Sequence, residues 1–212
     1  YEAMFSSELI MSALRTTLVI ALLSAVISTV IGTAACIGIS RMKRKPRAVV
    51  MGLNNIPMVN AEIVTGISLM LCFIAFGVSL GFGTILVSHI TFCIPYVVLS
   101  VMPKMKQLEP STYEAALDLG ASPLRAFWKV VFPDIRPGVL SGFLMAFTMS
   151  LDDFIITHFT KGAGVNTLST LIYSEVRKGI KPSLYALSTV MFLAVLILLV
   201  IANLPKGNKK EF

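Results

Sequence analysis

Long apolar segments recur along this chain, and they constrain its fold more than any other feature. Hydrophobic residues make up 56% of the 212 residues and charged residues only 14%, a composition typical of integral membrane proteins. A helix needs about 20 apolar residues to cross the core of a bilayer. The sequence therefore predicts an all-α fold, a single polytopic bundle of transmembrane helices over residues 1–212. Five segments are long enough, at about residues 16–39, 49–76, 82–102, 138–157 and 184–204.

The distribution of lysine and arginine predicts the orientation of these spans. Residues 41–47 hold five, residues 104–136 five and the tail after Pro205 three, so 13 of the 18 basic residues lie on one face. Cytoplasmic loops are enriched in lysine and arginine, which predicts a multi-pass protein of the inner membrane with a cytoplasmic carboxyl terminus. The amino terminus would then lie outside, and we expect a further span before Tyr1 that returns it to the cytoplasm.

Several other classes of function are disfavoured by the sequence. The net charge of +7 is explained by topology and anionic lipid rather than by nucleic-acid binding. Cys36, Cys72 and Cys93 lie in apolar spans without metal-ligand spacing and are interpreted as buried small hydrophobes. With two histidines in the chain, a metal site or a catalytic triad is not expected, and His89 is interpreted as a hydrogen-bonded structural residue.

A polar segment at residues 111–137 interrupts the apolar spans and carries explicit helix signals. Ser111 with Glu114 predicts a capping box at a helix start. Gly120 predicts a left-handed stop. Ser122 followed by Pro123 predicts a second start, and Pro133 predicts the end of that second helix. The segment therefore reads as helix, tight turn, helix, and its simplest interpretation is a surface hairpin that joins two spans.

This segment also resembles the "EAA" loop of permease subunits in ATP-binding-cassette importers. The resemblance rests on Glu114-Ala115-Ala116, Gly120 and a hydrophobic-proline pair at Phe132-Pro133, where the family usually has leucine before the proline. It implies a type I importer permease fold whose cytoplasmic coupling loop, residues 111–136, docks on an ATPase. The residues expected to make that contact are Glu114, Ala115, Ala116, Asp118, Gly120, Ala121, Ser122 and Pro133.

The energy source must lie in another polypeptide, because the chain has no Gly-x-x-x-x-Gly-Lys-Ser/Thr phosphate loop. We therefore expect no cofactor and no enzymatic activity in this chain, with ATP and Mg bound by the partner ATPase. Small residues in the loop would let its first helix lie in a groove of that partner, while Glu114 pairs with a basic residue there.

Three carboxylates inside the predicted spans are the candidate substrate-binding groups. If both segments are helical throughout, Glu62 lies roughly 20 Å and Asp152 about 22 Å into the bilayer. No lysine or arginine lies at that depth in any span, which indicates a cationic substrate. The alternative is that the carboxylates pair with a basic residue of a sister subunit or cap an unwound segment.

Helical spacing separates the two adjacent aspartates. Neighbouring helical residues point about 100° apart, so we expect Asp152 to face the substrate and Asp153 to have a packing or interhelical role. Phe92, Tyr96 and Phe154 could add cation-π contacts, although core packing is the simpler interpretation. The predicted substrate pathway is Glu62, Asp152, Asp153, Tyr96 and Phe92.

A narrower resemblance is carried by residues 88–95, 150–154 and 62–68, which look like the second permease subunit of spermidine/putrescine importers. That family has aspartate where this chain has Glu62. The resemblance implies a polyamine importer with a sister permease, two copies of a cytoplasmic ATPase and an external binding protein. The loop at residues 158–182 would receive that binding protein or is an ordinary connector. The alternatives are an importer permease for another substrate such as iron, and a membrane scaffold that transports nothing.

Overall fold

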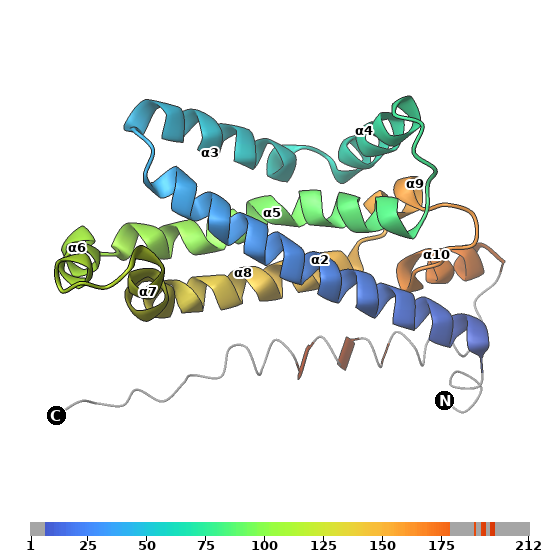
Figure 1. The fold of residues 1–212 in the computed structure, drawn as a ribbon. Coiled ribbons are helices and arrows are strands. Elements are labelled where there is room, and N and C mark those ends of the chain that lie inside the picture. Colours follow the sequence, from blue (N-terminus) through green and yellow to red (C-terminus); the bar gives the residue numbers. More distant parts are fainter. Residues whose placement is uncertain (1–6, 179–188, 190–191, 194–195, 198–212) are drawn as a thin grey trace. The chain divides into compact units, whose positions relative to one another are not determined.

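The computed structural model describes residues 7–178, 189, 192–193 and 196–197, and every regular element in this part is a helix (Figure 1). The all-α prediction is therefore confirmed for the described residues. In chain order the helices are α2 Glu8–Ser40, α3 Arg44–Val59, α4 Glu62–Ala75, α5 Phe82–Gln107, α6 Pro110–Asp118, α7 Pro123–Ala126, the π-helical η1 Phe127–Val131, α8 Phe132–Asp152, α9 Ile155–Thr160 and α10 Leu168–Lys178.

The chain divides into two compact units. The smaller unit comprises residues 1–16 and 166–212. In its described part, Ile10 and Ala13 at the start of α2 pack against Leu168 and Leu171 of α10. The larger unit comprises residues 17–165. It contains all of the predicted site residues.

Three described helices are long and apolar enough to cross a membrane. They are Glu8–Ser40, Phe82–Gln107 and the continuous helical stretch Pro123–Asp152. The predicted spans at 16–39 and 82–102 lie within the first two. Nearly all of the predicted span at 184–204 lies outside the described residues.

The predicted span at 49–76 is not one straight helix. α3 and α4 meet at an angle of 104°, because Asn60 and Ala61 adopt extended backbone conformations between them. Pro57 does not make this break, because it lies inside α3. The break comes after the Asn60 amide donates the last bond of that helix to Ile56. Glu62 therefore opens a new helix, and the depth expected for it from an unbroken helix does not apply.

The predicted span at 138–157 also differs from the structure. Its helix begins earlier, through α7 and η1, and ends at Asp152. Asp153 is extended, with ψ of 125°, and α9 starts two residues later. Pro133 does not stop a helix as expected. It lies in the first turn of α8 directly after the π-helical η1, where the wider π-turn accommodates a residue that has no amide hydrogen to donate.

Small residues bring α5 and α8 together along the centre of the larger unit (Figure 1). Gly138, Gly142, Ala146 and Ser150 recur every four residues on α8, and all four are buried. A Cβ atom at Gly138 would lie 2.9 Å from the backbone oxygen of Ser100. Close backbone approach at small residues is the usual way in which helices associate in membranes.

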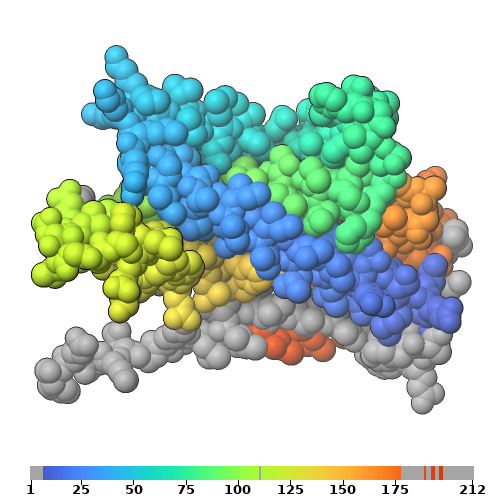
Figure 2. Space-filling model, in the orientation of Figure 1, coloured from blue at the N-terminus to red at the C-terminus, as the bar shows by residue number. Residues whose placement is uncertain are grey.

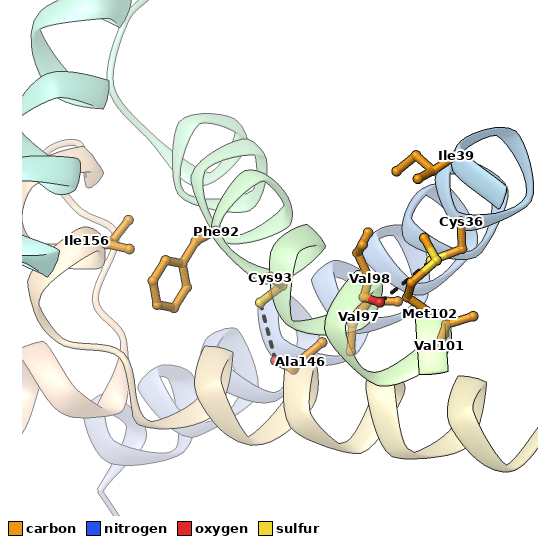
Figure 3. Close-up of a cluster of buried hydrophobic side chains, with 11 residues drawn as sticks. Cys36, Ile39, Phe92, Cys93, Val97, Val98, Val101, Met102, Ala146 and Ile156 are labelled. Atoms are coloured by element: carbon orange, nitrogen blue, oxygen red, sulfur yellow. Dashed lines mark hydrogen bonds between the residues drawn. The ribbon is translucent and has the colours of Figure 1, made fainter. Parts of the chain in front are cut away.

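The core beside this contact is shown in Figure 3. The Cys93 thiol donates to the Ala146 carbonyl at 3.4 Å, and the Cys36 thiol donates to the Val98 carbonyl at 3.7 Å. Both cysteines are buried, as the sequence predicts, whereas Cys72 on α4 is exposed. The prediction for Cys72 is wrong for this structure because the outer face of α4 is not covered by other described helices.

The polar segment forms a helix, a turn and a second helix. Gly120 has a positive φ of 84°, so the predicted left-handed stop is confirmed. The Ser122 side chain accepts from the Arg125 amide at 3.4 Å with Pro123 in the first turn, as predicted. The predicted capping box at Ser111 is wrong. α6 begins at Pro110, and its N-cap Glu109 makes no side-chain cap, because proline already fits the first helical position.

Candidate functional site

The predicted substrate carboxylates lie at the two breaks in the helices. Glu62 is the first residue of α4, Asp152 is the last residue of α8, and Asp153 lies between α8 and α9. α4 and α9, the helices that follow the two breaks, pack against each other. Gly66 lies at this contact, where an added Cβ would come within 3.4 Å of the Ile156 Cα atom. The backbone therefore brings both breaks into one region of the larger unit.

Asp153 is fully engaged by the structure around it. Its Oδ1 accepts from the Ile156 amide at 3.2 Å, and its Oδ2 accepts from the Thr157 amide at 2.8 Å and the Thr157 hydroxyl at 2.9 Å. These amides belong to the first turn of α9, whose free donors favour a carboxylate. Asp153 therefore caps an unwound segment, which is one of the alternatives that the sequence left open.

His89 on α5 is the second partner of Asp153. Its Nε2 atom lies 3.3 Å from Asp153 Oδ2, and both side chains are 3% exposed. Nε2 also lies 2.9 Å from the Thr157 hydroxyl, and Nδ1 lies 2.6 Å from the Ser150 hydroxyl. The Ser24 hydroxyl of α2 donates to Ser150 at 2.9 Å. His89 is hydrogen-bonded, as the sequence predicts, and its contact with Asp153 agrees with the interhelical role expected for that aspartate.

Asp152 and Glu62 differ from Asp153 because both are exposed. Within the described part of the chain, Asp152 makes no hydrogen bond or ion pair. The Glu62 carboxylate is close enough to the Tyr96 hydroxyl to interact with it electrostatically. These two carboxylates can therefore meet a ligand without first breaking an internal contact.

The predicted aromatic residues divide in the same way. The Phe92 and Tyr96 rings lie 5.3 Å apart on α5. Phe92 is only 4% exposed and packs in the core near Ile156 (Figure 3), whereas Tyr96 is half-buried. Phe154 in the second break packs against His158, with ring centroids 5.3 Å apart. Of the predicted aromatic residues, Tyr96 is the one that interacts electrostatically with a predicted carboxylate, that of Glu62.

Sequence reasoning missed the partners of His89. Ser150 and Thr157 come from two different helices, Ser24 of a third helix bonds to Ser150, and nothing in their local sequence shows that they gather around one ring. One local signal could have identified the role of Asp153. It precedes the amides of Ile156 and Thr157 by three and four residues, which is close to the spacing of an N-cap aspartate.

The predicted coupling residues lie together at one end of the larger unit, where α6 and α7 form the yellow-green segment of Figure 2. Three large apolar side chains of this segment are open to solvent. Leu119 is 89% exposed, Leu124 70% and Trp128 55%. Glu114, Ala115, Asp118, Gly120, Ser122 and Pro133 are exposed as well, and Ala116 and Ala121 are partly buried. Exposed apolar side chains of this kind are candidates for contact with a partner.

A cavity of about 690 Å³ lies under this segment. Its walls come from the last residues of α2 and α5, from α6 and from the stretch Pro123–Asp134. The Arg41 guanidinium lies 6.0 Å from the centre of the Tyr113 ring, which links the end of α2 to α6 by a cation-π contact.

Comparison with known proteins places these features in a family. The model of a protein family described as "binding-protein-dependent transport system inner membrane component" matches residues 27–205 of this chain. The spermidine/putrescine transport system permease protein PotC of Haemophilus influenzae is 34% identical over 96% of this chain and 79% of its own length. The putrescine transport system permease protein PotI of Escherichia coli K12 is 36% identical over 92% of this chain and 72% of its own length.

A solved structure shares the fold. The crystal structure of an amino acid ABC transporter with histidines matches with a TM-score of 0.66 and 17% identity, and covers 91% of this chain and 90% of that chain. The family match, the membrane-length helices and the shared fold all indicate a membrane permease. The chain therefore belongs to the family of binding-protein-dependent transport system inner membrane components, a multi-pass, non-catalytic permease subunit of an ABC importer in which ATP is handled by a separate subunit.

Proposed function

We propose that this chain is the permease subunit of a polyamine importer and forms half of the route taken by spermidine or putrescine. The observation that carries the proposal is the similarity, over nearly the whole chain, to permease proteins named for these two substrates. The chemistry of the site supports it. Glu62 and Asp152 are exposed carboxylates without an ion pair among the described residues, and a polyamine is a chain of ammonium groups.

The two carboxylates would act as successive or paired contacts for the cation. Glu62 opens α4 and Asp152 ends α8, so each stands at a break where backbone groups are also free to face a pathway. Tyr96, which interacts electrostatically with Glu62, would supply an aromatic face for an ammonium group. Asp153 would contribute to the route indirectly, since its oxygens are already bonded within the protein. Phe92 would act through core packing.

The α6–α7 segment would carry the motion from the ATPase. Docking of the exposed Leu119, Leu124 and Trp128 on the ATPase surface would cover an apolar patch, and Glu114 would pair with a basic residue of that partner. α7 is the first part of the helical stretch that ends at Asp152. Closure of the ATPase pair would then shift this stretch and change access to the carboxylates. This arrangement puts the α6–α7 end in the cytoplasm, with a sister permease beside the chain and a binding protein outside.

The proposal is tested by ATP hydrolysis of the complex that copurifies with this tagged chain, with the polyamine-binding protein present. We expect spermidine to stimulate hydrolysis in the wild type and the stimulation to be lost in Asp152→Asn. If an ATPase copurifies but spermidine has no effect on the wild type, the cargo is a different substrate, such as iron. If the chain is a scaffold without transport, neutralising Glu62 or Asp152 should leave the rate of ATP hydrolysis unchanged.

A further inference from the structure

We infer that His89 is a positioning residue for transport: it fixes the break between α8 and α9, and so holds the Asp152 carboxylate where a transported cation meets it. This inference rests on the proposed function. It goes beyond it by assigning a transport role to a buried side chain that lies on another helix and cannot itself touch the substrate from its buried position.

The hydrogen bonds on one side of the ring have a defined direction. The Thr157 hydroxyl has one hydrogen, which it donates to Asp153 Oδ2 at 2.9 Å. The same hydroxyl lies 2.9 Å from His89 Nε2 and must therefore accept from it. Nε2 thus carries a hydrogen, and this hydrogen points toward Thr157 and Asp153. The ring holds the first turn of α9 through this nitrogen.

The other nitrogen holds the end of α8. His89 Nδ1 lies 2.6 Å from the hydroxyl of Ser150, two residues before Asp152. Ser150 also receives a hydrogen bond from Ser24 of α2 at 2.9 Å. One imidazole therefore spans the break, with its two nitrogens on the last turn of α8 and the first turn of α9. A flexible side chain could not hold two helix ends at a fixed separation in this way.

The hydrogen-bonded side chains around His89 are buried. Ser24 and Ser150 are 0% and 3% exposed, and His89 and Thr157 are 2% and 1% exposed. Unsatisfied polar groups are costly in an apolar interior, so loss of the ring would force the two helix ends to find other partners. Asp152 lies between the two points that His89 holds, and its direction would change with them.

The test is a double-mutant cycle measured by uptake of radiolabelled spermidine into proteoliposomes that contain the whole complex. We expect His89→Leu to raise KM for spermidine about tenfold with a smaller change in Vmax. In the Asp152→Asn background, the same substitution should change KM less than about twofold, because the carboxylate that it positions is gone. Equal effects in both backgrounds would overturn the inference and leave His89 with a purely structural role.

A second pair of variants guards against misfolding of His89→Leu. Thr157→Val removes the hydroxyl that accepts from Nε2 while keeping the side-chain shape, and Thr157→Ser keeps the hydroxyl. We expect Thr157→Val to raise KM for spermidine and Thr157→Ser to have a KM near the wild-type value. A wild-type KM in Thr157→Val would contradict the inference. If the wild-type complex takes up no polyamine at all, the proposed function is wrong, and the inference falls with it.

Discussion

The Nε2 atom of His89 lies 3.3 Å from Oδ2 of Asp153, and the two side chains belong to α5 and to the break between α8 and α9. This contact separates the roles of two adjacent aspartates. The Asp153 carboxylate is bonded to other groups of the protein, while the adjacent Asp152 is exposed.

Replacement of Asp153 should lower stability. Asp153→Ala removes the cap of α9 and the partner of His89, and loss of an N-cap costs about 1–2 kcal/mol. We expect a lower midpoint of thermal unfolding for the purified complex. Asp152→Asn is the matched control and should leave this midpoint unchanged, because Asp152 makes no hydrogen bond or ion pair with described residues. A wild-type midpoint in Asp153→Ala would show that the cap does not stabilise the break.

Replacement of Glu62 should weaken transport through loss of charge. We expect Glu62→Gln to raise KM for spermidine uptake about tenfold, equivalent to about 1.4 kcal/mol of lost attraction. Glu62→Asp keeps the charge with one methylene fewer and should lie close to wild type. Uptake kinetics in Glu62→Gln equal to those of the wild type would remove this carboxylate from the pathway.

Enlarging a glycine at the contact of α5 with α8 should destabilise the protein. In Gly138→Ala the new methyl would lie 2.9 Å from the Ser100 backbone oxygen, and overpacking of this kind costs about 1–3 kcal/mol. Gly38→Ala is the control, because nothing lies within 4 Å of its Cβ position. The control should be neutral or stabilising, since alanine favours helix over glycine by about 1 kcal/mol. The midpoint of thermal unfolding should therefore fall in Gly138→Ala and stay unchanged or rise in Gly38→Ala.

Binding of the ATPase should depend on the charge of Glu114 but not on that of the nearby Glu109. Glu114→Gln should weaken binding of the ATPase about fivefold, measured as the salt concentration that releases ATPase from the immobilised permease. Glu109→Gln is the control, as Glu109 lies before α6 and lines the cavity. Equal release from both variants would show that docking does not use the charge of Glu114.

Leu119 should contribute the apolar part of the same contact. It is 89% exposed, so Leu119→Asp should leave the permease folded, yet it should reduce the copurified ATPase strongly because a buried, unpaired charge is costly at an interface. The amount of ATPase that copurifies, together with the unfolding midpoint of the permease, checks both parts. Loss of folded permease instead would mean that Leu119 packs within the subunit.

Several features of this protein follow from the sequence by itself. The apolar segments and the basic loops predict a helical membrane protein, because the bilayer demands long apolar helices whatever their neighbours are. The turn at Gly120 and the helix start at Ser122-Pro123 are also local, since a left-handed glycine and an N-cap serine act within a few residues. These predictions agree with the structure because short-range chemistry decides them.

Where the long helices break, and which groups hold Asp153, depended on the tertiary structure. Asn60 and Asp153 lie inside segments that are apolar enough to continue as helices, and neither break has a proline or glycine at it. A break inside an apolar region is possible only when other groups satisfy the freed backbone and charge. For Asp153 the Thr157 hydroxyl and the amides of α9 are close in sequence, but His89 comes from 64 residues earlier. Partners so distant along the chain meet only through folding, which is why the sequence could predict the carboxylates and an interhelical role for Asp153 but could not identify His89 as its partner.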